Sequence, residues 1–143
     1  MTMQAGWNGN FGLSAYGGSA PSVPKIWAQA ISSRNVGTVM ALYCPNAVLV
    51  PTFSRTILRG APQLSAYFQE FLARPGLRCK IDSELVQDIS PDCMVASGDY
   101  TFTQKTGSGS RKAIRARFTY VLVRDSQGTW KIATQHSSAM PKE

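Results

Sequence analysis

From residue 78 onward the chain consists of four consecutive segments with strand character, each separated from the next by a turn signal. Short clusters containing proline, glycine or aspartate lie between them. The predicted strands are Arg78–Ile89, Cys93–Gln104, Ala113–Arg124 and Thr129–Gln135. Strands joined by such short connections pair antiparallel. The chain therefore ends in an antiparallel sheet, and other elements have to cover one of its faces.

Helical patterns lie almost entirely before this run of strands. Ser22 can cap a helix whose apolar residues recur at helical spacing. Asn35 can cap a second, short helix, which Pro45 is expected to stop. A third predicted helix begins at the Gly-Ala-Pro of residues 60–62 and ends at the Pro-Gly of residues 75–76.

A short strand separates the second helix from the third. Ala47–Thr52 has strand character, with Pro51 at its end or on an edge, and Ser54–Arg59 is expected to be a turn or small hairpin. The whole order predicts an α+β protein of cone shape, in which a curved, mostly antiparallel sheet wraps around N-terminal helices. The other face of such a sheet often pairs with a second copy, so we expect a homodimer.

The length of 143 residues is that of one ordinary domain, which we place at residues 22–143. Residues 1–21 are rich in small and polar residues and are interpreted as a flexible arm. No apolar run approaches the ~20 residues of a membrane-spanning helix, so no membrane partner is expected. The net charge of +7 either serves solubility or attracts anions such as bicarbonate. The basic residues are scattered and accompany no recognition motif, which argues against nucleic acid as a partner.

Cysteine and histidine usage limits the metal chemistry. Three widely spaced cysteines do not form a disulfide framework, which fits a soluble protein of a reducing, intracellular compartment. The single histidine, His136, excludes a zinc site built from three histidines. The 8 acidic residues are spread out, and a carboxylate site for Mg²⁺ or Mn²⁺ stays open as an alternative. We expect no protein-bound metal and no other cofactor.

His136 is also the only side chain whose reference pKa, about 6.5, suits proton transfer near pH 7. Strand alternation would place it on one face with Trp130, Ile132 and Thr134. If the last hairpin has a four-residue loop, Arg117 pairs with His136, although a one-residue slip would remove that pairing. A purely structural role for His136 stays open.

The order of elements resembles the nuclear-transport-factor-2-like superfamily, whose bent sheet wraps around a long helix and leaves a pocket. The stretches 115–123, 128–132 and 135–141 resemble the association domain of calmodulin-dependent kinase II and its bacterial relatives. The closest resemblance is to the iota class of carbonic anhydrases. It is carried by AVLVPTFS (47–54), YFQEFL (67–72), GDYTFT (98–103) and HSS (136–138), and it covers about residues 23 to 141.

This resemblance implies reversible hydration of CO2 to bicarbonate, without metal, by hydroxyl groups around a small pocket. Carried over residue by residue, it assigns catalysis to Thr52, Tyr67 and Ser138. The substrate-binding residues expected around them are Phe71, Tyr100, Arg117, His136 and Ser137. The iota class has several histidines before the Ser-Ser pair, whereas Thr134 and Gln135 precede His136 here. If the source is an alga, the resemblance implies a plastid.

Activation of water near neutral pH would call for a tyrosine pKa below its reference value of about 10. A nearby cation or donated hydrogen bonds would lower it, and Arg59 and Arg117 are the cations expected beside Tyr67. Thr52 and Ser138 would then orient the water and donate hydrogen bonds to the forming bicarbonate.

Two other functions stay open. One is a pocket that binds a small organic ligand, or an isomerase or cyclase acting on one, and such a pocket usually needs a deep carboxylate. Asp99 is the best candidate for that group, although it could instead form a buried ion pair with Arg117. The other is a non-catalytic association domain that multimerises a longer chain.

Overall fold

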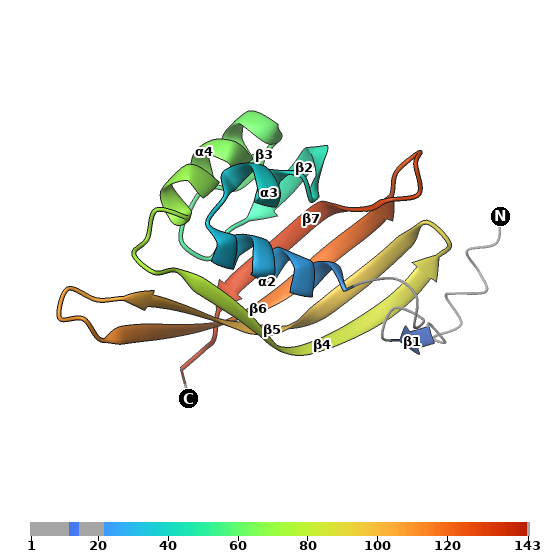
Figure 1. Cartoon of the computed structure of the whole chain (residues 1–143). Helices are drawn as coiled ribbons and strands as arrows, with labels where there is room; N and C mark the ends of the chain where they lie inside the picture. The colour runs from blue at the N-terminus through green and yellow to red at the C-terminus, as the bar shows by residue number, and fades with distance from the viewer. Residues whose placement is uncertain (1–11, 15–21, 143) are drawn as a thin grey trace.

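The computed structural model describes residues 12–14 and 22–142. In these ranges helices lie on one side of a curved sheet, and the predicted α+β cone fold is confirmed (Figure 1). The helices are α2 (Val23–Ser33), α3 (Val36–Met40) and α4 (Ala61–Phe71). The strands are β1 (Gly12–Ser14), β2 (Tyr43–Val50), β3 (Leu58–Arg59), β4 (Arg78–Ser90), β5 (Cys93–Lys105), β6 (Arg111–Arg124) and β7 (Trp130–Ala139).

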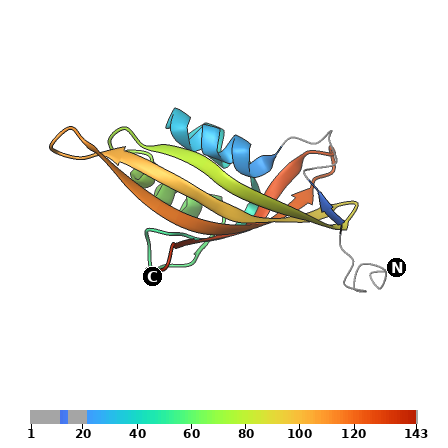
Figure 2. The same ribbon diagram turned by 90° about the horizontal axis from the view of Figure 1, so that it is seen from below.

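The strands form a single sheet in the order β1-β4-β5-β6-β7-β2-β3. All neighbouring pairs are antiparallel except β2 and β7, which run parallel. The four long strands β4 to β7 are consecutive both in the chain and in the sheet, as predicted. Figure 2 shows them from below as one curved surface with α4 behind it.

Local sequence signals set the starts of the helices. The Ser22 hydroxyl accepts a hydrogen bond from the Lys25 backbone N–H at 3.2 Å, and the Asn35 side chain accepts one from Thr38 at 2.9 Å. Both predicted caps are thereby confirmed. Helix α4 follows Gly60, whose φ of 83° is a conformation that glycine adopts without strain.

The core lies between the helices and the face of the sheet that they cover, which we call the inner face. Strand alternation divides β6 cleanly, since Phe118 and Tyr120 are buried while Arg117 and Thr119 are exposed on the opposite, outer face. Large side chains that are almost fully buried against one another in this layer are Trp27, Ile31, Leu64, Phe68, Tyr100 and Tyr120.

Pro45 does not stop a helix, so that prediction was wrong. Helix α3 already ends at Met40, and β2 begins at Tyr43. Strand β2 pairs with β7 at Tyr43 and next at Val48, with a register irregularity between these two residues. Pro45 lies in this irregular stretch, where the missing N–H of proline removes no regular ladder bond.

A bulge in β7 overturns the predicted alternation of Trp130, Ile132, Thr134 and His136 on one face. Val121 of β6 is paired with Thr134, but its neighbour Leu122 is paired with Ile132, so β7 holds one extra residue at this point. The extra residue reverses which positions of the strand point to the inner face. Before the bulge the even-numbered Ile132 is buried. After it the odd-numbered Gln135 and Ser137 are buried, and His136 is exposed.

The predicted arm, residues 1–21, lies mostly outside the described residues. Within it, Gly12–Ser14 form β1, which pairs with β4. In the described part of the chain no helix is long and apolar enough to cross a bilayer.

Candidate functional site

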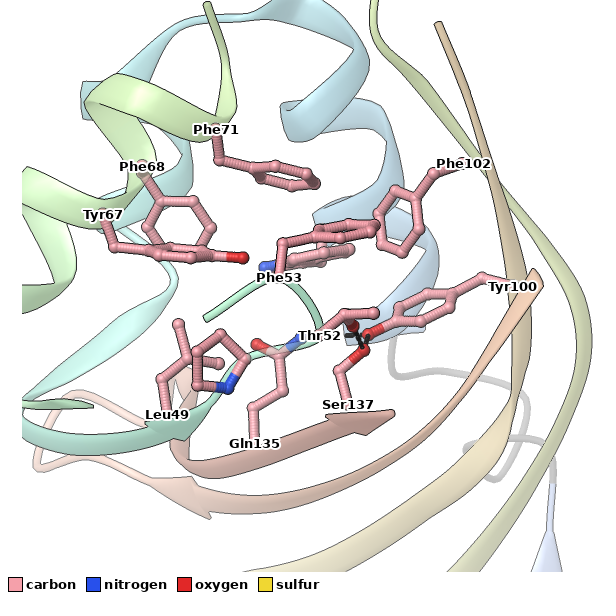
Figure 3. Close-up of a pocket in the computed structure, with 12 residues that line it drawn as sticks. Leu49, Thr52, Phe53, Tyr67, Phe68, Phe71, Tyr100, Phe102, Gln135 and Ser137 are labelled. Atoms are coloured by element: carbon pink, nitrogen blue, oxygen red, sulfur yellow. Dashed lines mark hydrogen bonds between the residues drawn. The ribbon is translucent and has the colours of Figure 1, made fainter. Parts of the chain in front are cut away.

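A narrow cavity opens between α4, α2 and the inner face of the sheet (Figure 3). Its free volume is about 10 Å³, which is about the room of one water molecule. Pockets for drug-sized ligands are roughly 300 to 1,000 Å³, so this cavity is suited to a molecule of only a few atoms. It is lined by Trp27, Leu49, Pro51, Thr52, Phe53, Tyr67, Phe68, Phe71, Tyr100, Phe102, Gln135 and Ser137.

Three hydroxyl groups meet on one wall of the cavity, where Figure 3 shows them joined by dashed lines. The Tyr100 hydroxyl donates to Ser137 Oγ at 2.6 Å, and Ser137 Oγ is hydrogen-bonded to Thr52 Oγ1. Tyr100 comes from β5, Ser137 from β7, and Thr52 follows the end of β2. Distant stretches of the sequence thus supply one hydroxyl cluster, which we name the Thr52–Ser137–Tyr100 cluster.

A buried amide lies behind this cluster. Gln135 is only 1% exposed. Its Nε2 donates to the Tyr120 hydroxyl at 3.2 Å and to the Tyr100 hydroxyl at 3.4 Å, while its Oε1 accepts from Tyr43. Trp27 Nε1 in turn donates to the Tyr43 hydroxyl at 2.9 Å. The polar groups of the inner face are therefore hydrogen-bonded to one another.

Tyr67 reaches the cavity from α4, on the side opposite the hydroxyl cluster (Figure 3). Burial raises the pKa of Tyr67 to about 12, although the backbone N–H of Phe53 and the charge of Arg74 act in the other direction. The expected lowering of a tyrosine pKa by Arg59 and Arg117 is therefore wrong. Tyr67 carries its proton at neutral pH, so its hydroxyl can donate a hydrogen bond.

Arg59 and Arg117 lie apart from Tyr67 for reasons of strand geometry. Arg59 is exposed in the short strand β3, and Arg117 is exposed on the outer face. Arg117 is paired with Ser138, and Thr119 with His136, so the expected pairing of Arg117 with His136 is wrong.

The outer face carries the remaining residues of the predicted site. Arg117, His136 and Ser138 line an open hollow of about 370 Å³ together with Ser97, Gly98, Phe118 and Thr119. Consecutive strand residues point to opposite faces, and Ser137 rather than Ser138 therefore points into the cavity. The structure thus brings Thr52, Tyr67, Phe71, Tyr100 and Ser137 together and places Ser138, His136 and Arg117 elsewhere.

Asp99, the carboxylate considered for an isomerase, does not line the cavity. It forms an ion pair with Arg115 at 3.1 Å and accepts a hydrogen bond from the Ser83 hydroxyl. The hydrogen bond from Ser83, and then the one from Arg115, hold the pKa of Asp99 below its ordinary value. The predicted buried pair with Arg117 is replaced by this more exposed pair with Arg115.

A wider vestibule of about 360 Å³ shares Phe53, Tyr67 and Phe71 with the cavity. Its other lining residues are Ser54, Glu70 and Arg74. The Arg74 guanidinium lies 4.3 Å from the centre of the Phe53 ring and donates to Gln104 at 3.2 Å. Its side chain is thereby held beside the mouth of the cavity, where it can attract an anion.

Sequence reasoning missed Gln135 and Arg74 as site residues. In the sequence, Gln135 stands out only as a departure from a histidine-rich pattern. Arg74 follows Tyr67 by seven residues and Phe71 by three, a helical spacing that could have indicated a shared face. In the part of the chain that the structure describes, no three His, Cys, Asp or Glu side chains gather in a way that could hold a metal ion.

Comparison with known proteins identifies relatives of two kinds. The sequence profile of the calcium/calmodulin dependent protein kinase II association domain family matches residues 22–141. A solved structure from Xanthomonas campestris, described as such an association domain, is 34% identical in sequence. The match covers 82% of each chain with a TM-score of 0.75.

More distant structures share the fold. A ketosteroid isomerase-like protein from Erwinia carotovora atroseptica is 18% identical over 84% of this chain and 92% of that one, with a TM-score of 0.69. A protein of the NTF2-like family from Streptomyces avermitilis, described as a dehydratase, is 14% identical over 84% and 93%, with a TM-score of 0.73. No curated protein matches the chain. The distant structures show that the chain has the NTF2-like fold.

Proposed function

The chain belongs to the calcium/calmodulin dependent protein kinase II association domain family, and from that premise we propose that its cavity interconverts CO2 and bicarbonate without a protein-bound metal. The NTF2-like fold serves unrelated functions, so the activity has to be argued from the site. The observation that carries the proposal is the convergence of the Thr52–Ser137–Tyr100 cluster and the Tyr67 hydroxyl on a cavity with room for only a very small molecule.

The walls of the cavity suit an uncharged substrate. Phe53, Phe71 and Phe102 form a connected aromatic surface, with ring centroids 5.5 to 5.8 Å apart. CO2 has no net charge and no dipole, so it is more easily transferred into such surroundings than water or an ion. The small free volume also favours CO2 over the larger organic ligands of an isomerase or cyclase.

The polar wall suits the charge that develops during hydration. The oxygen of a water molecule bonds to the carbon of CO2, one C=O electron pair moves onto an oxygen, and a proton passes to water in the vestibule. Thr52 and Tyr67 then donate hydrogen bonds to the oxygens that acquire negative charge. Preformed donors of this kind stabilise the transition state because they need no reorganisation during the reaction.

The vestibule suits the product. Bicarbonate is an anion, and Arg74 lies at the mouth of the cavity. Its positive charge attracts bicarbonate as it leaves during CO2 hydration, and as it enters during the reverse reaction. Glu70 also lines the vestibule and is exposed to solvent. No step of this proposal is assigned to a metal ion or to His136.

The test is a stopped-flow CO2 hydration assay in buffer treated with a chelator. We expect wild-type protein to accelerate hydration above the buffer rate, and Thr52→Val to lower that rate on the order of a hundredfold because one donor is lost. Thr119→Val on the outer face is the matched control and should keep wild-type activity. Folded wild-type protein that gives only the buffer rate would remove the proposal.

We also propose self-association, since the family is named for an association domain. The outer face of β5 to β7, which no helix covers (Figures 1 and 2), is the surface that a second copy would use. Light scattering at micromolar concentration should then give a mass of at least two chains. A mass of 15.5 kDa, that of one chain, would contradict it.

A further inference from the structure

In the hydrogen bonds behind the cavity, the contacts determine which group donates and which accepts, starting from Trp27. An indole N–H can only donate. Trp27 Nε1 donates to the Tyr43 hydroxyl at 2.9 Å, so the Tyr43 oxygen is an acceptor there and its own hydrogen has to go elsewhere. That hydrogen is donated to Gln135 Oε1. The atom of Gln135 that faces Tyr43 is thus required to be the amide oxygen.

This requirement settles the orientation of the Gln135 amide, which the shape of the side chain alone does not determine. With Oε1 facing Tyr43, the two Nε2 hydrogens face Tyr100 and Tyr120, at 3.4 and 3.2 Å. The Tyr100 oxygen therefore accepts from Gln135, and its hydrogen goes to Ser137 Oγ at 2.6 Å.

The same donor-to-acceptor order continues from Tyr100 to the hydroxyl groups at the cavity. Ser137 Oγ accepts from Tyr100, so its single hydrogen is available for Thr52 Oγ1, its other partner. Among the described residues, Ser137 is the only hydrogen-bond partner of the Thr52 hydroxyl. Once Thr52 Oγ1 accepts from Ser137, its own hydrogen is left to point into the cavity that it lines.

Tyr67 lines the cavity from the other side. Burial raises the pKa of Tyr67 to about 12, so its hydroxyl carries a proton that it can donate. Two O–H groups on opposite sides can therefore donate hydrogen bonds into one small space. A group that offers lone pairs, such as the oxygens of a small oxyanion, satisfies both, whereas a group that offers only hydrogens satisfies neither.

We propose that Gln135 is a positioning residue which, through Tyr100 and Ser137, fixes Thr52 as a hydrogen-bond donor to an oxygen atom of the ligand, such as an oxygen of bicarbonate. This inference deepens the proposed function and rests on it for the identity of bicarbonate as the physiological ligand. The direction of the hydrogen bonds, however, stands on the contacts alone and can be measured without any activity.

Neutron diffraction from crystals exchanged into D2O tests the direction itself. We expect the deuterium of Tyr43 to point to Gln135, that of Tyr100 to Ser137, and that of Ser137 to Thr52. A Tyr100 deuterium that points to Gln135, or a Ser137 deuterium that points to Tyr100, would overturn the inference.

Binding of ¹³C-bicarbonate, followed by NMR titration, tests the consequence. Tyr43 does not line the cavity, yet Tyr43→Phe releases the Gln135 amide and should weaken bicarbonate binding about tenfold, the value of one hydrogen bond to a charged group. Tyr120→Phe also removes a buried hydroxyl that contacts Gln135, but this hydroxyl is not between Gln135 and Thr52 in the series of hydrogen bonds. This variant should keep the wild-type affinity. Gln135→Met interrupts the series of hydrogen bonds without adding a charge, and it should weaken binding as much as Tyr43→Phe does.

The possible results separate this inference from the proposed function. Wild-type protein that binds bicarbonate tightly enough to measure but gives no CO2 hydration would remove the proposed reaction and leave the inference standing. Equal affinities of wild-type, Tyr43→Phe and Gln135→Met proteins, all folded by circular dichroism, would overturn the inference even if hydration is fast. Wild-type protein that binds no bicarbonate would overturn the role of Thr52 as a donor to bicarbonate.

Discussion

Tyr67 carries the clearest chemical constraint among the individual residues of the site. Burial raises its pKa to about 12, so the hydroxyl stays protonated throughout the physiological range. Its role in the proposed reaction is therefore to donate a hydrogen bond, and it does not act as a base. This distinction has a kinetic consequence, because a donor that does not titrate contributes equally at every pH below its pKa.

We predict that Tyr67→Phe lowers the CO2 hydration rate by the same factor at pH 7 and at pH 9, on the order of a hundredfold for the loss of one donor. The measurement is kcat/KM at both pH values for the two proteins. If the loss grew severalfold between pH 7 and pH 9, Tyr67 would be acting as an ionised base and the assignment of a donor would be wrong.

The sequence predicted part of this site. Thr52 and Tyr67 were identified by resemblance, and both line the cavity. The resemblance points to Ser138, whereas Ser137 is the serine that lines the cavity. The face to which a strand residue points depends on register, and register is set by contacts between strands. The bulge in β7 opposite Val121 and Leu122 leaves no mark that a single sequence would reveal.

At the scale of elements, the close pairing of β4 and β5 explains why residue 98 is a glycine. Gly98 of β5 is paired with Glu84 of β4, next to a register irregularity between Ile81 and Ser83. A Cβ atom at Gly98 would lie 2.0 Å from the Ser83 carbonyl oxygen and 2.8 Å from the Phe118 ring. Backbone cannot yield at such a distance without moving the strand, so the close approach of β4 and β5 requires glycine here.

We predict that Gly98→Ala lowers the free energy of unfolding on the order of 3 kcal/mol, because a methyl group is forced against backbone. Gly107→Ala is the matched control, since a Cβ there meets no atom within 4 Å, and its effect should stay within about 0.5 kcal/mol. Urea unfolding of the three proteins gives both values. Equal stabilities would show that β4 and β5 are not packed as described.

Element types and their order were predictable because caps, prolines and apolar spacing are local signals. The order of strands in the sheet was not, since the parallel pairing of β2 with β7 joins segments that lie far apart in the chain. Pro45 shows the limit of local signals. It looks like a helix stop, yet tertiary contacts of Tyr43 and Val48 draw it into an irregular strand.

At the scale of the whole molecule, the buried hydroxyl groups make stability depend on alkaline pH. Burial raises the pKa of Tyr43, Tyr67 and Tyr100 above the ordinary value for tyrosine. In the unfolded chain these groups ionise near pH 10, whereas the folded protein keeps their protons. The unfolded state then holds fewer protons, so the free energy of unfolding falls as the pH rises above 10.

We predict that this loss includes about 1 kcal/mol per pH unit from Tyr67 alone between pH 10 and pH 12. Below pH 9 the contribution is fully present and should not vary. Urea unfolding at pH 8, 10 and 11 measures the slope, and Tyr67→Phe should reduce it by that amount. Identical slopes for the two proteins would contradict the raised pKa of Tyr67.

The most direct measurement of the central claim is the rate of CO2 hydration, in chelator-treated buffer, for wild-type protein and two neighbouring serine variants. Ser137 lies in the cavity and Ser138 lines the hollow on the outer face. We predict that Ser137→Ala loses most of the activity and that Ser138→Ala keeps it. Retained activity in Ser137→Ala together with loss in Ser138→Ala would contradict the claim and move the chemistry to the outer face.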